Sequence, residues 1–467
     1  MGLKAQTVTN SQTIKEAIYL IILFLLMINL AIVCLYRLEA SEVHNWDEAR
    51  HGVNAYEMMV NNNYLVSTYN YQTDYYNYKP PLSMWLIMLD YTIFGYNTFA
   101  LRIGSAICTL LMALMLALFL RKEFGKGAAL LFMLFFSFNN EMLFFHMARS
   151  GDADAVYMLF ICAGIIGLYY AFPRPAMGRS AGIGYFTIFL VGLCFAMAFM
   201  AKTLHAVLLL IIGLVYILLK CRSTLKQWSL ILLSGLAGCF PIVIWAICRY
   251  RFDRFKFIGG MFWKEVGGRL VGEKKDYLSY LVYYLTDEAV LFMLGFVLVA
   301  LLSIGLVKRA KSRHSIGTDV ESDVNNEKGI KGITHKLSLF VIGFIVPLIV
   351  YSISGKLMEW YGYAGLIALT VLFSIVGARL LSCLTRRLSG RLLPVGMVII
   401  FLLAGTGYFW SVNYERLEIT HPPDFRLALQ ATVYRYPDYA GATIYIEKDN
   451  NEYRPADEWE QKYLLEA

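Results

Sequence analysis

The sequence predicts an all-α protein that crosses a membrane many times, and three observations indicate this fold class. Of the 467 residues, 58% are hydrophobic and 16% are charged, a balance that soluble domains rarely show. The apolar residues form runs close to the roughly 20 residues that a helix needs to cross a bilayer. Lys and Arg recur in every second connection between these runs. A helical bundle is expected because helices satisfy their backbone polar groups inside the membrane.

Hydropathy predicts about eleven membrane-spanning helices. They are expected near residues 17–36, 99–120, 127–145, 154–171, 181–200, 204–219, 228–248, 287–307, 337–353, 361–381 and 393–411. The first run follows the polar residues 1–15 and has no small-residue cleavage pattern. It is therefore expected to remain as a span and not to be removed as a signal peptide.

The distribution of basic residues predicts how the spans are oriented. With the N-terminus in the cytoplasm, every cytoplasmic connection is basic. The residues concerned are Arg121 with Lys122, Arg174 with Arg179, Lys220 with Arg222, Lys308 through Arg313, and Arg386 with Arg387. The polar stretch 308–336 is expected to be a cytoplasmic linker without a core of its own. Three longer segments, 37–98, 249–286 and 412–467, then face outward, and catalytic residues are expected there.

This topology predicts two parts. Residues 1–411 are expected to form a transmembrane domain, and residues 412–467 a small outward α/β appendage. Within the first outward segment, Pro80 and Pro81 are expected to open a short interfacial helix that carries Trp85.

The cysteines and the net charge exclude other classes of protein. The eight cysteines lie mostly inside apolar runs and show neither the spacing of a disulfide framework nor that of a metal site. They are expected to pack in the core. The net charge of +8 follows from the basic residues that orient the spans, so it does not indicate nucleic-acid binding.

The outward side should be poor in Lys and Arg, yet basic residues gather there. They are Arg50, Lys79, Arg102, Arg149, Lys202, Arg249, Arg251, Arg254, Lys256, Lys264, Arg269 and Lys356. Ionisable groups at span ends are costly unless they are paired or face a cavity, and a bound phosphate would satisfy many of them. Snorkelling toward lipid head groups is the alternative for any single residue, but it explains the whole set less well.

The first outward segment holds the densest group of polar side chains. If residues 47–60 form a helix, Asp47, Arg50 and His51 share one face at i, i+3 and i+4, where an acid and a base would meet one substrate. The alternative is an N-capping Asp47 with a local ion pair. Lys79 would lie at the N-terminal end of the interfacial helix, where anions bind well.

Two acids stand just before the expected span 154–171. Asp152 and Asp154 are at i and i+2 and would not share a helix face, so one is expected in the site and the other to cap the helix. Farther along, the segment 249–286 alternates basic and aromatic residues. That pattern suits a phosphate-headed lipid at the membrane interface.

Together these segments resemble the polyprenyl-phosphate-dependent, GT-C-type glycosyltransferases related to the aminoarabinose transferases of lipid A and the protein O-mannosyltransferases. The resemblance runs from about Trp46 to Leu357. The motifs that carry it are Asp47 to Arg50 with Glu57 and Met58, Tyr76 to Pro80 with Trp85, Arg149 to Asp154, Ala201 with Lys202, Glu265 with Arg269, and Ser354 to Leu357.

The resemblance implies a GT-C-like bundle and a role for each matching residue. Asp47 would be the catalytic base, and Asp154 or Asp152 the second acid, with Glu48 in the same acidic motif. Tyr76 and Lys79 would hold the donor phosphate. The remaining positions around the donor are Lys202, Arg269, Lys356, Arg50, Arg149 and Glu265. Met358 and Glu359 depart from the family pattern, where a proline is usual, and the spans are fewer than in the aminoarabinose transferases.

The implied activity is inverting transfer of a sugar from a polyprenyl (undecaprenyl) phosphate to a lipid, glycan or protein acceptor. It would occur on the periplasmic side of a bacterial inner membrane, by a monomer, with Asp47 taking the acceptor proton. No cofactor is firmly expected. A divalent metal at Asp47, His51 and Asp154 stays open, with His44 or His146 as further ligands. A lipid-linked sugar flippase or a non-catalytic glycan-assembly subunit is the alternative, although no inverted repeat is evident.

Overall fold

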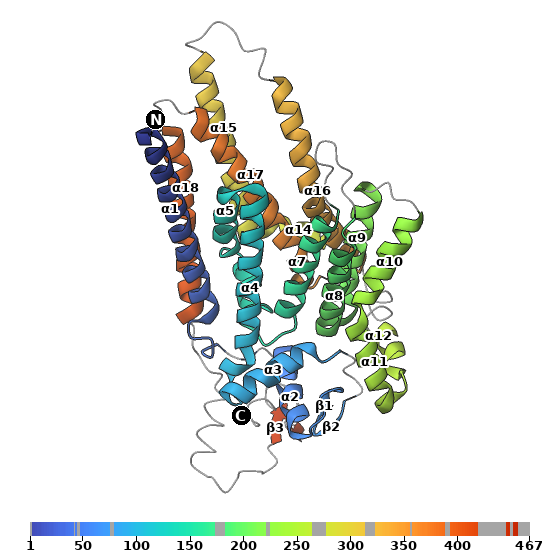
Figure 1. The fold of residues 1–467 in the computed structure, drawn as a ribbon. Helices are drawn as coiled ribbons and strands as arrows, with labels where there is room; N and C mark the ends of the chain where they lie inside the picture. Colours follow the sequence, from blue (N-terminus) through green and yellow to red (C-terminus); the bar gives the residue numbers. More distant parts are fainter. Residues whose placement is uncertain are drawn as a thin grey trace.

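The computed structural model describes residues 2–41, 43, 47–74, 79–172, 183–220, 225–263, 277–312, 323–354, 357–387, 393–418, 445–448 and 452–455. Figure 1 shows a bundle of long helices, with shorter helices gathered at the end opposite the N-terminus. The predicted all-α membrane fold is confirmed.

The long helices account for the apolar runs of the sequence. They are α1 (Gly2–Leu35), α4 (Thr98–Phe124), α7 (Asp154–Ala171), α8 (Tyr185–Lys202), α9 (Val207–Lys220), α10 (Leu225–Gly238), α11 (Phe240–Asp253), α15 (Glu288–Ser312), α16 (Asp323–Ser354), α17 (Tyr363–Arg387) and α18 (Leu393–Glu418). Among the described residues, eight stretches are long and apolar enough to cross a membrane. The number is nine if α10 and α11, which are bent by 49°, form one span.

The expected number of about eleven spans is therefore not confirmed. Two expected windows, 181–200 and 204–219, fall in one 35-residue stretch, Tyr185–Leu219, which is interrupted by the 3-10 turn η1 (Thr203–Ala206). A third window, 127–145, is divided between the 11-residue helix α5 (Lys126–Phe136) and the short helix α6 (Asn140–Phe144). Helix α5 ends early because the side-chain amide of Asn139 donates to the carbonyl of Phe135 at 2.8 Å, replacing a helical partner.

Helices α8 and α10 approach each other closely through glycines. A Cβ on Gly192 would lie 2.1 Å from the carbonyl oxygen of Gly235, and a Cβ on Gly238 would lie 2.2 Å from that of Phe189. Small residues of this kind let two helix backbones touch, which in a membrane is the main source of helix–helix attraction.

Short elements cover one end of the bundle, called the site end below (Figure 1). They include α2 (Asp47–Val60), α3 (Leu82–Phe94), α6 (Asn140–Phe144), α12 (Lys256–Phe262), and the antiparallel strands β1 (Thr68–Tyr69) and β2 (Gln72–Thr73). Ala49 and Val53 of α2 pack with Met84 and Ile87 of α3 and Leu101 of α4 in one apolar cluster. This packing fixes α2 to the membrane bundle.

Some helices end or begin at residues that differ from the boundaries expected from the sequence. Helix α15 continues to Ser312 and α16 begins at Asp323, so both extend into the stretch expected as a linker. Helix α18 ends at Glu418, beyond the expected boundary of 411. In the expected appendage, the described residues form α18's end and the antiparallel strands β3 (Tyr445–Lys448) and β4 (Glu452–Pro455).

Asp90 is a buried acid where α3 packs on α4. Its side chain is 6% exposed, and a Cβ on Gly104 would lie 2.5 Å from its Oδ2, so glycine is needed for this approach. Burial raises the pKa of Asp90 to about 6, and the Gly104 backbone opposes part of the shift. The charged form is therefore the unfavourable one in the folded protein.

We expect Asp90→Asn to change how stability depends on pH. A raised carboxyl pKa contributes stability that is fully present below the unfolded pKa of 3.8 and is lost as the pH rises through about 6. Wild type should therefore lose roughly 2–3 kcal/mol of unfolding free energy between about pH 4 and pH 8 that Asp90→Asn does not lose. Denaturant unfolding across this range checks it, with Glu415→Gln on the exposed end of α18 as the control. Parallel curves for Asp90→Asn and wild type would contradict it.

Candidate active site

Asp47 opens α2 at the site end, as the sequence predicted for a helix over 47–60. Arg50 donates from Nη2 to Oδ1 of Asp47 at 2.6 Å, and the Lys79 ammonium lies 3.8 Å from the same oxygen. The Asp47 side chain is 31% exposed, so its carboxylate remains accessible. Burial acts to raise the pKa of Asp47, but Lys79 and Arg50 outweigh it and hold the pKa below its usual value. Asp47 is therefore an ionised acceptor at neutral pH.

Asp152 lies between two imidazoles. Its Oδ1 is 3.3 Å from Nδ1 of His51, and its Oδ2 contacts Nδ1 of His146. Burial acts to raise the pKa of Asp152, but the two histidines hold it well below its usual value. His146 in turn stacks on the ring of Trp360, with 4.1 Å between the ring centroids. His146 also adopts a left-handed backbone conformation (φ 63°), which aims its ring at Asp152.

The two histidines differ in charge because their surroundings differ. Burial and the neighbouring Lys79 lower the pKa of His51 despite the contact with Asp152. Burial also disfavours a charged His146, but Asp152 outweighs it and raises the pKa of His146. His51 is thus the neutral ring, and its Nε2 lies 3.5 Å from Nζ of Lys79, where it can accept a hydrogen bond from the ammonium.

Asp154 begins α7 and pairs with Lys202, the last residue of α8. Nζ of Lys202 contacts both carboxylate oxygens, and the two side chains are 8% and 1% exposed. From the sequence, only one of Asp152 and Asp154 is expected in the site. The structure brings both into the same charged cluster, because Asp152 precedes the helix and the spacing rule for a helix face does not apply to it.

Glu48, another predicted site residue, joins the segments around the site. Glu48 accepts from Nε of Arg102 at 2.6 Å and from the backbone N–H of Gly151 at 2.8 Å. The same guanidinium donates to the carbonyl of Leu38 at 2.9 Å, so α2, α4, the turn before α7 and the segment after α1 meet at one buried ion pair. These contacts give Glu48 a positioning role.

Arg149 binds backbone carbonyls. Its guanidinium donates to the carbonyls of Val33 at 3.1 Å, Tyr36 at 2.9 Å and Arg37 at 2.8 Å, which close the end of α1 and the turn after it. The side chain is buried. Arg149 thereby ties α1 to the loop that carries Asp152.

Four predicted site residues lie outside the described residues: Tyr76, Glu265, Arg269 and Lys356. They remain predictions. In the neighbouring segment, Arg249 is fully buried, with its guanidinium 4.7 Å from the ring centroid of Phe257 and 5.5 Å from that of Trp245. At least this member of the expected basic–aromatic strip therefore packs inside the protein.

A divalent cation could be held by a set that differs from the expected one. Asp47, His146 and Asp152 each offer one ligand atom, and these atoms lie within 4.8 Å of one another. The set expected from the sequence is Asp47, His51 and Asp154. Two carboxylates and one imidazole suit a divalent transition metal. His44, another expected ligand, lies outside the described residues.

Comparisons with known proteins point to one group of enzymes. A family model described as dolichyl-phosphate-mannose-protein mannosyltransferase matches residues 78–245. An undecaprenyl phosphate-alpha-4-amino-4-deoxy-L-arabinose arabinosyl transferase of Pseudomonas savastanoi pv. phaseolicola is 29% identical over 247 residues, covering 51% of this chain and 43% of that one. Its counterpart named arabinosyl transferase 2, from Proteus mirabilis, is 24% identical over 241 residues, covering 51% of this chain and 42% of that one. The chain thus spans about half the length of the curated relatives it matches.

A solved structure shows the same fold. The crystal structure of ArnT from Cupriavidus metallidurans bound to undecaprenyl phosphate has a TM-score of 0.58 and 16% identity, covering 89% of this chain and 65% of that one. The relationship expected from the sequence motifs is confirmed. The chain is related to the GT-C-type, polyprenyl-phosphate-dependent glycosyltransferases and has their membrane fold.

Proposed function

We propose that the chain is an integral membrane glycosyltransferase that moves a sugar from a polyprenyl-phosphate carrier to an acceptor at the site end. The observation that carries this is the accessible Asp47 carboxylate, 31% exposed, with the Lys79 ammonium 3.8 Å away and Arg50 at 2.6 Å. A base beside phosphate-binding cations is what displacement at a sugar–phosphate bond requires. The printed names of the relatives, undecaprenyl phosphate arabinosyl transferases and a mannosyltransferase family, support the same class.

The reaction is a single displacement. The acceptor oxygen attacks the anomeric carbon, the new C–O bond forms as the bond to the phosphate breaks, and the configuration at that carbon inverts. Asp47 takes the acceptor's proton as a general base. The leaving phosphate keeps the bonding electron pair, and Lys79 with Arg50 stabilises its growing charge. Tyr76, Arg269, Lys356 and Glu265 complete the donor site in this proposal.

Buried charged groups surround Asp47. Asp152, held by His51 and His146, has a carboxylate oxygen within 4.8 Å of one of Asp47, and Lys202 is paired with Asp154 in the same region. Lys202 is a third cation offered to the leaving phosphate. If a divalent metal binds at Asp47, His146 and Asp152, it would supply a further positive charge for the phosphate.

The site end faces the periplasm of a bacterial inner membrane in this proposal. The basic connections Arg121 with Lys122, and the start of the chain, lie at the opposite end of the bundle, where the positive-inside rule puts the cytoplasm (Figure 1). The acceptor is a lipid, a glycan or a protein hydroxyl. A lipid-linked sugar flippase is the rival function, since it too needs a cavity for a lipid phosphate.

We expect purified wild-type protein to transfer labelled sugar from a polyprenyl-phosphate donor to an acceptor glycolipid. Asp47→Ala should lower the rate by about 10²–10⁴-fold because the general base is lost. Lys79→Ala should lower it by about 10²-fold because a cation beside the leaving phosphate is lost. Lys122→Ala, at the other end of α4, is the matched control and should keep wild-type activity.

Radiolabel transfer in detergent and donor translocation in sealed vesicles distinguish the two functions. Donor that crosses the vesicle membrane without transfer to any acceptor, at a rate that Asp47→Ala leaves unchanged, would refute the transferase and support the flippase.

A further inference from the structure

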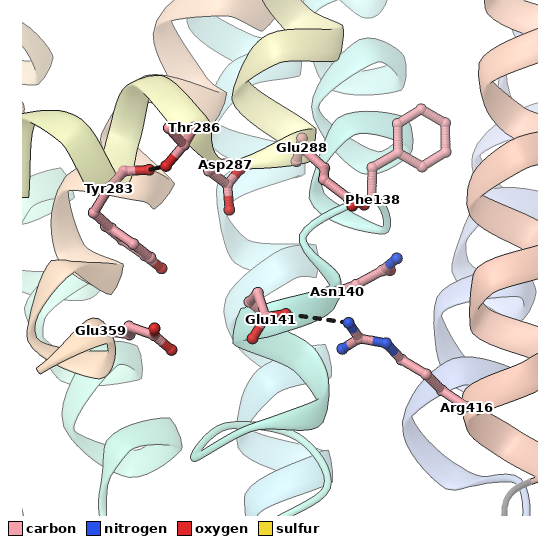
Figure 2. A pocket seen from close by; sticks show the side chains of 10 residues that line it. Phe138, Asn140, Glu141, Tyr283, Thr286, Asp287, Glu288, Glu359 and Arg416 are labelled. Carbon is pink, nitrogen blue, oxygen red and sulfur yellow. Dashed lines mark hydrogen bonds and ion pairs between the residues drawn. The ribbon is translucent and has the colours of Figure 1, made fainter.

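A second polar pocket lies at the α14–α15 junction, outside the cluster around Asp47. Helix α14 covers Ser279–Thr286, and the facing wall comes from α6, from the 3-10 turn η3 (Glu359–Gly362) and from α18. The cavity has a volume of about 190 Å³. Figure 2 shows its side chains, with acids on three sides of the opening.

The pocket is strongly acidic. Four carboxylates line it, those of Glu141, Asp287, Glu288 and Glu359, against one guanidinium, that of Arg416. Arg416 donates to Glu141 at 3.1 Å (Figure 2). Asp287 accepts from the backbone N–H of Val290 at 2.9 Å and caps α15, and burial raises its pKa to about 6. More negative charge gathers here than the described side chains neutralise.

An unpartnered buried amide in the same wall indicates a missing ligand. Asn140 is 5% exposed, and neither its Nδ2 nor its Oδ1 has a hydrogen-bond partner among the described residues. The hydroxyl of Tyr283, also in the wall, is buried and likewise without a described partner. Buried polar atoms are nearly always hydrogen-bonded, so a polar group of a ligand is expected to form hydrogen bonds with these atoms.

The arrangement fits an organic cation better than a bare metal ion. Ca²⁺ and Mg²⁺ need several oxygens that converge within about 2.0–2.6 Å of one point. In the described part of the chain, the acids that converge within 4.8 Å are those of the Asp47 cluster, and the four pocket acids form no such group. The cavity also has room for about six water-sized groups, at ~30 Å³ each. A primary ammonium needs only one carboxylate within hydrogen-bond distance, and the polar body that carries it can meet the other groups of the wall.

We propose that this pocket binds a molecule that carries a primary ammonium on a small polar body, either a free amine or the headgroup of an amine-bearing lipid. The ammonium would pair with the carboxylate of Asp287 or Glu359, and the Asn140 amide and the Tyr283 hydroxyl offer hydrogen bonds to the polar body. The inference does not depend on the transferase activity, because binding is measured directly.

The pocket and the candidate active site share a wall. Glu359 precedes Trp360, which stacks on His146, and Tyr363 donates through its hydroxyl to the carbonyl of Phe145 at 2.8 Å. A ligand bound in the pocket would therefore contact the segments that position His146.

Calorimetric titration of ethanolamine into the full-length protein tests the proposal, using nanodiscs of phosphatidylcholine. Saturable binding is expected in wild type, and choline should bind more weakly because its methylated nitrogen donates no hydrogen bond. Asp287→Asn with Glu359→Gln should weaken binding at least about tenfold, since charge-assisted hydrogen bonds are lost. Asparagine still caps α15, so the helix is kept. Asn140→Leu should weaken binding as well, and Glu415→Gln, a carboxylate outside the pocket, should not.

Nanodiscs that contain phosphatidylethanolamine distinguish the two sources. If the pocket binds the lipid headgroup, phosphatidylethanolamine occupies it and ethanolamine binding is lost in these discs. If the ligand is a free amine, ethanolamine binding is unchanged. The proposal is overturned if ethanolamine does not bind in phosphatidylcholine discs, if choline binds equally well, or if the double variant binds like wild type. Saturable binding of Mg²⁺ without binding of ethanolamine would instead make it a metal site.

Discussion

Arg102→Met is expected to lower the free energy of unfolding by about 3–5 kcal/mol, because it leaves the Glu48 carboxylate buried and unpaired. Arg102 is fully buried and Glu48 is 1% exposed. The guanidinium also donates hydrogen bonds to the carbonyls of Leu38 and Ser41, both at 2.9 Å, so the change removes these links to the segment between α1 and α2. Chemical unfolding in detergent, followed by circular dichroism, measures the loss.

Two further variants separate charge burial from packing. Arg121→Met removes an ion pair with Glu16 whose side chains are 37% and 38% exposed, and it should cost far less stability than Arg102→Met because water screens exposed charges. Glu48→Gln combined with Arg102→Met removes both buried charges and should recover part of the lost stability. A loss for Arg102→Met no larger than that for Arg121→Met would contradict the structural role given to this pair.

Lys202→Met is expected to reduce sugar transfer by about 10²–10³-fold, the usual effect of losing one preorganised group that stabilises transition-state charge. Lys202 contacts both oxygens of Asp154, and its ammonium lies 5.3 Å from the ring centroid of Tyr361. The variant also leaves a buried carboxylate without its partner, so its stability should fall too. Initial rates at saturating donor, corrected for the folded fraction, give the effect on the reaction itself.

A double variant decides what Lys202 does. Lys202→Met with Asp154→Asn removes both charges and should restore stability. If Lys202 acts on the donor phosphate, transfer stays low in the double variant. Recovered transfer would show instead that Lys202 serves only to neutralise Asp154. Lys226→Met, on the exposed start of α10, is the lysine control and should be neutral.

Local features of the site could be predicted from the sequence. The helix over 47–60 and the shared face of Asp47 and Arg50 follow from spacing along one helix, and the ion pair at 2.6 Å agrees with it. The partner of Glu48 could not be predicted, because Arg102 is 54 residues away and the contact depends on how α2 lies on α4. His146 was expected only as a further metal ligand, and its contact with Asp152, six residues on, depends on a left-handed turn at His146 that residue spacing does not reveal.

The acidic pocket shows a second limit of sequence reasoning. Its acids come from α6, from the α14–α15 junction and from η3, and each looks like an ordinary end-of-helix charge when read alone. The adjacent acids Asp287 and Glu288 were a usable signal. The positive-inside rule marks misplaced Lys and Arg but says little about acids, so it does not single out this group.

The glycine contact between α8 and α10 has a consequence for how freely this protein can evolve. Positions 192 and 238 admit no side chain, since any Cβ would overlap a neighbouring backbone by more than packing can absorb. On the opposite side of α10, Leu232, Leu233 and Leu236 are exposed on the surface of the bundle, and lipid tails accept any apolar replacement there. Along α10, Gly238 is therefore fixed while these leucines can change, so sequence divergence among relatives should be greater on the lipid-facing side of α10 than where it meets α8.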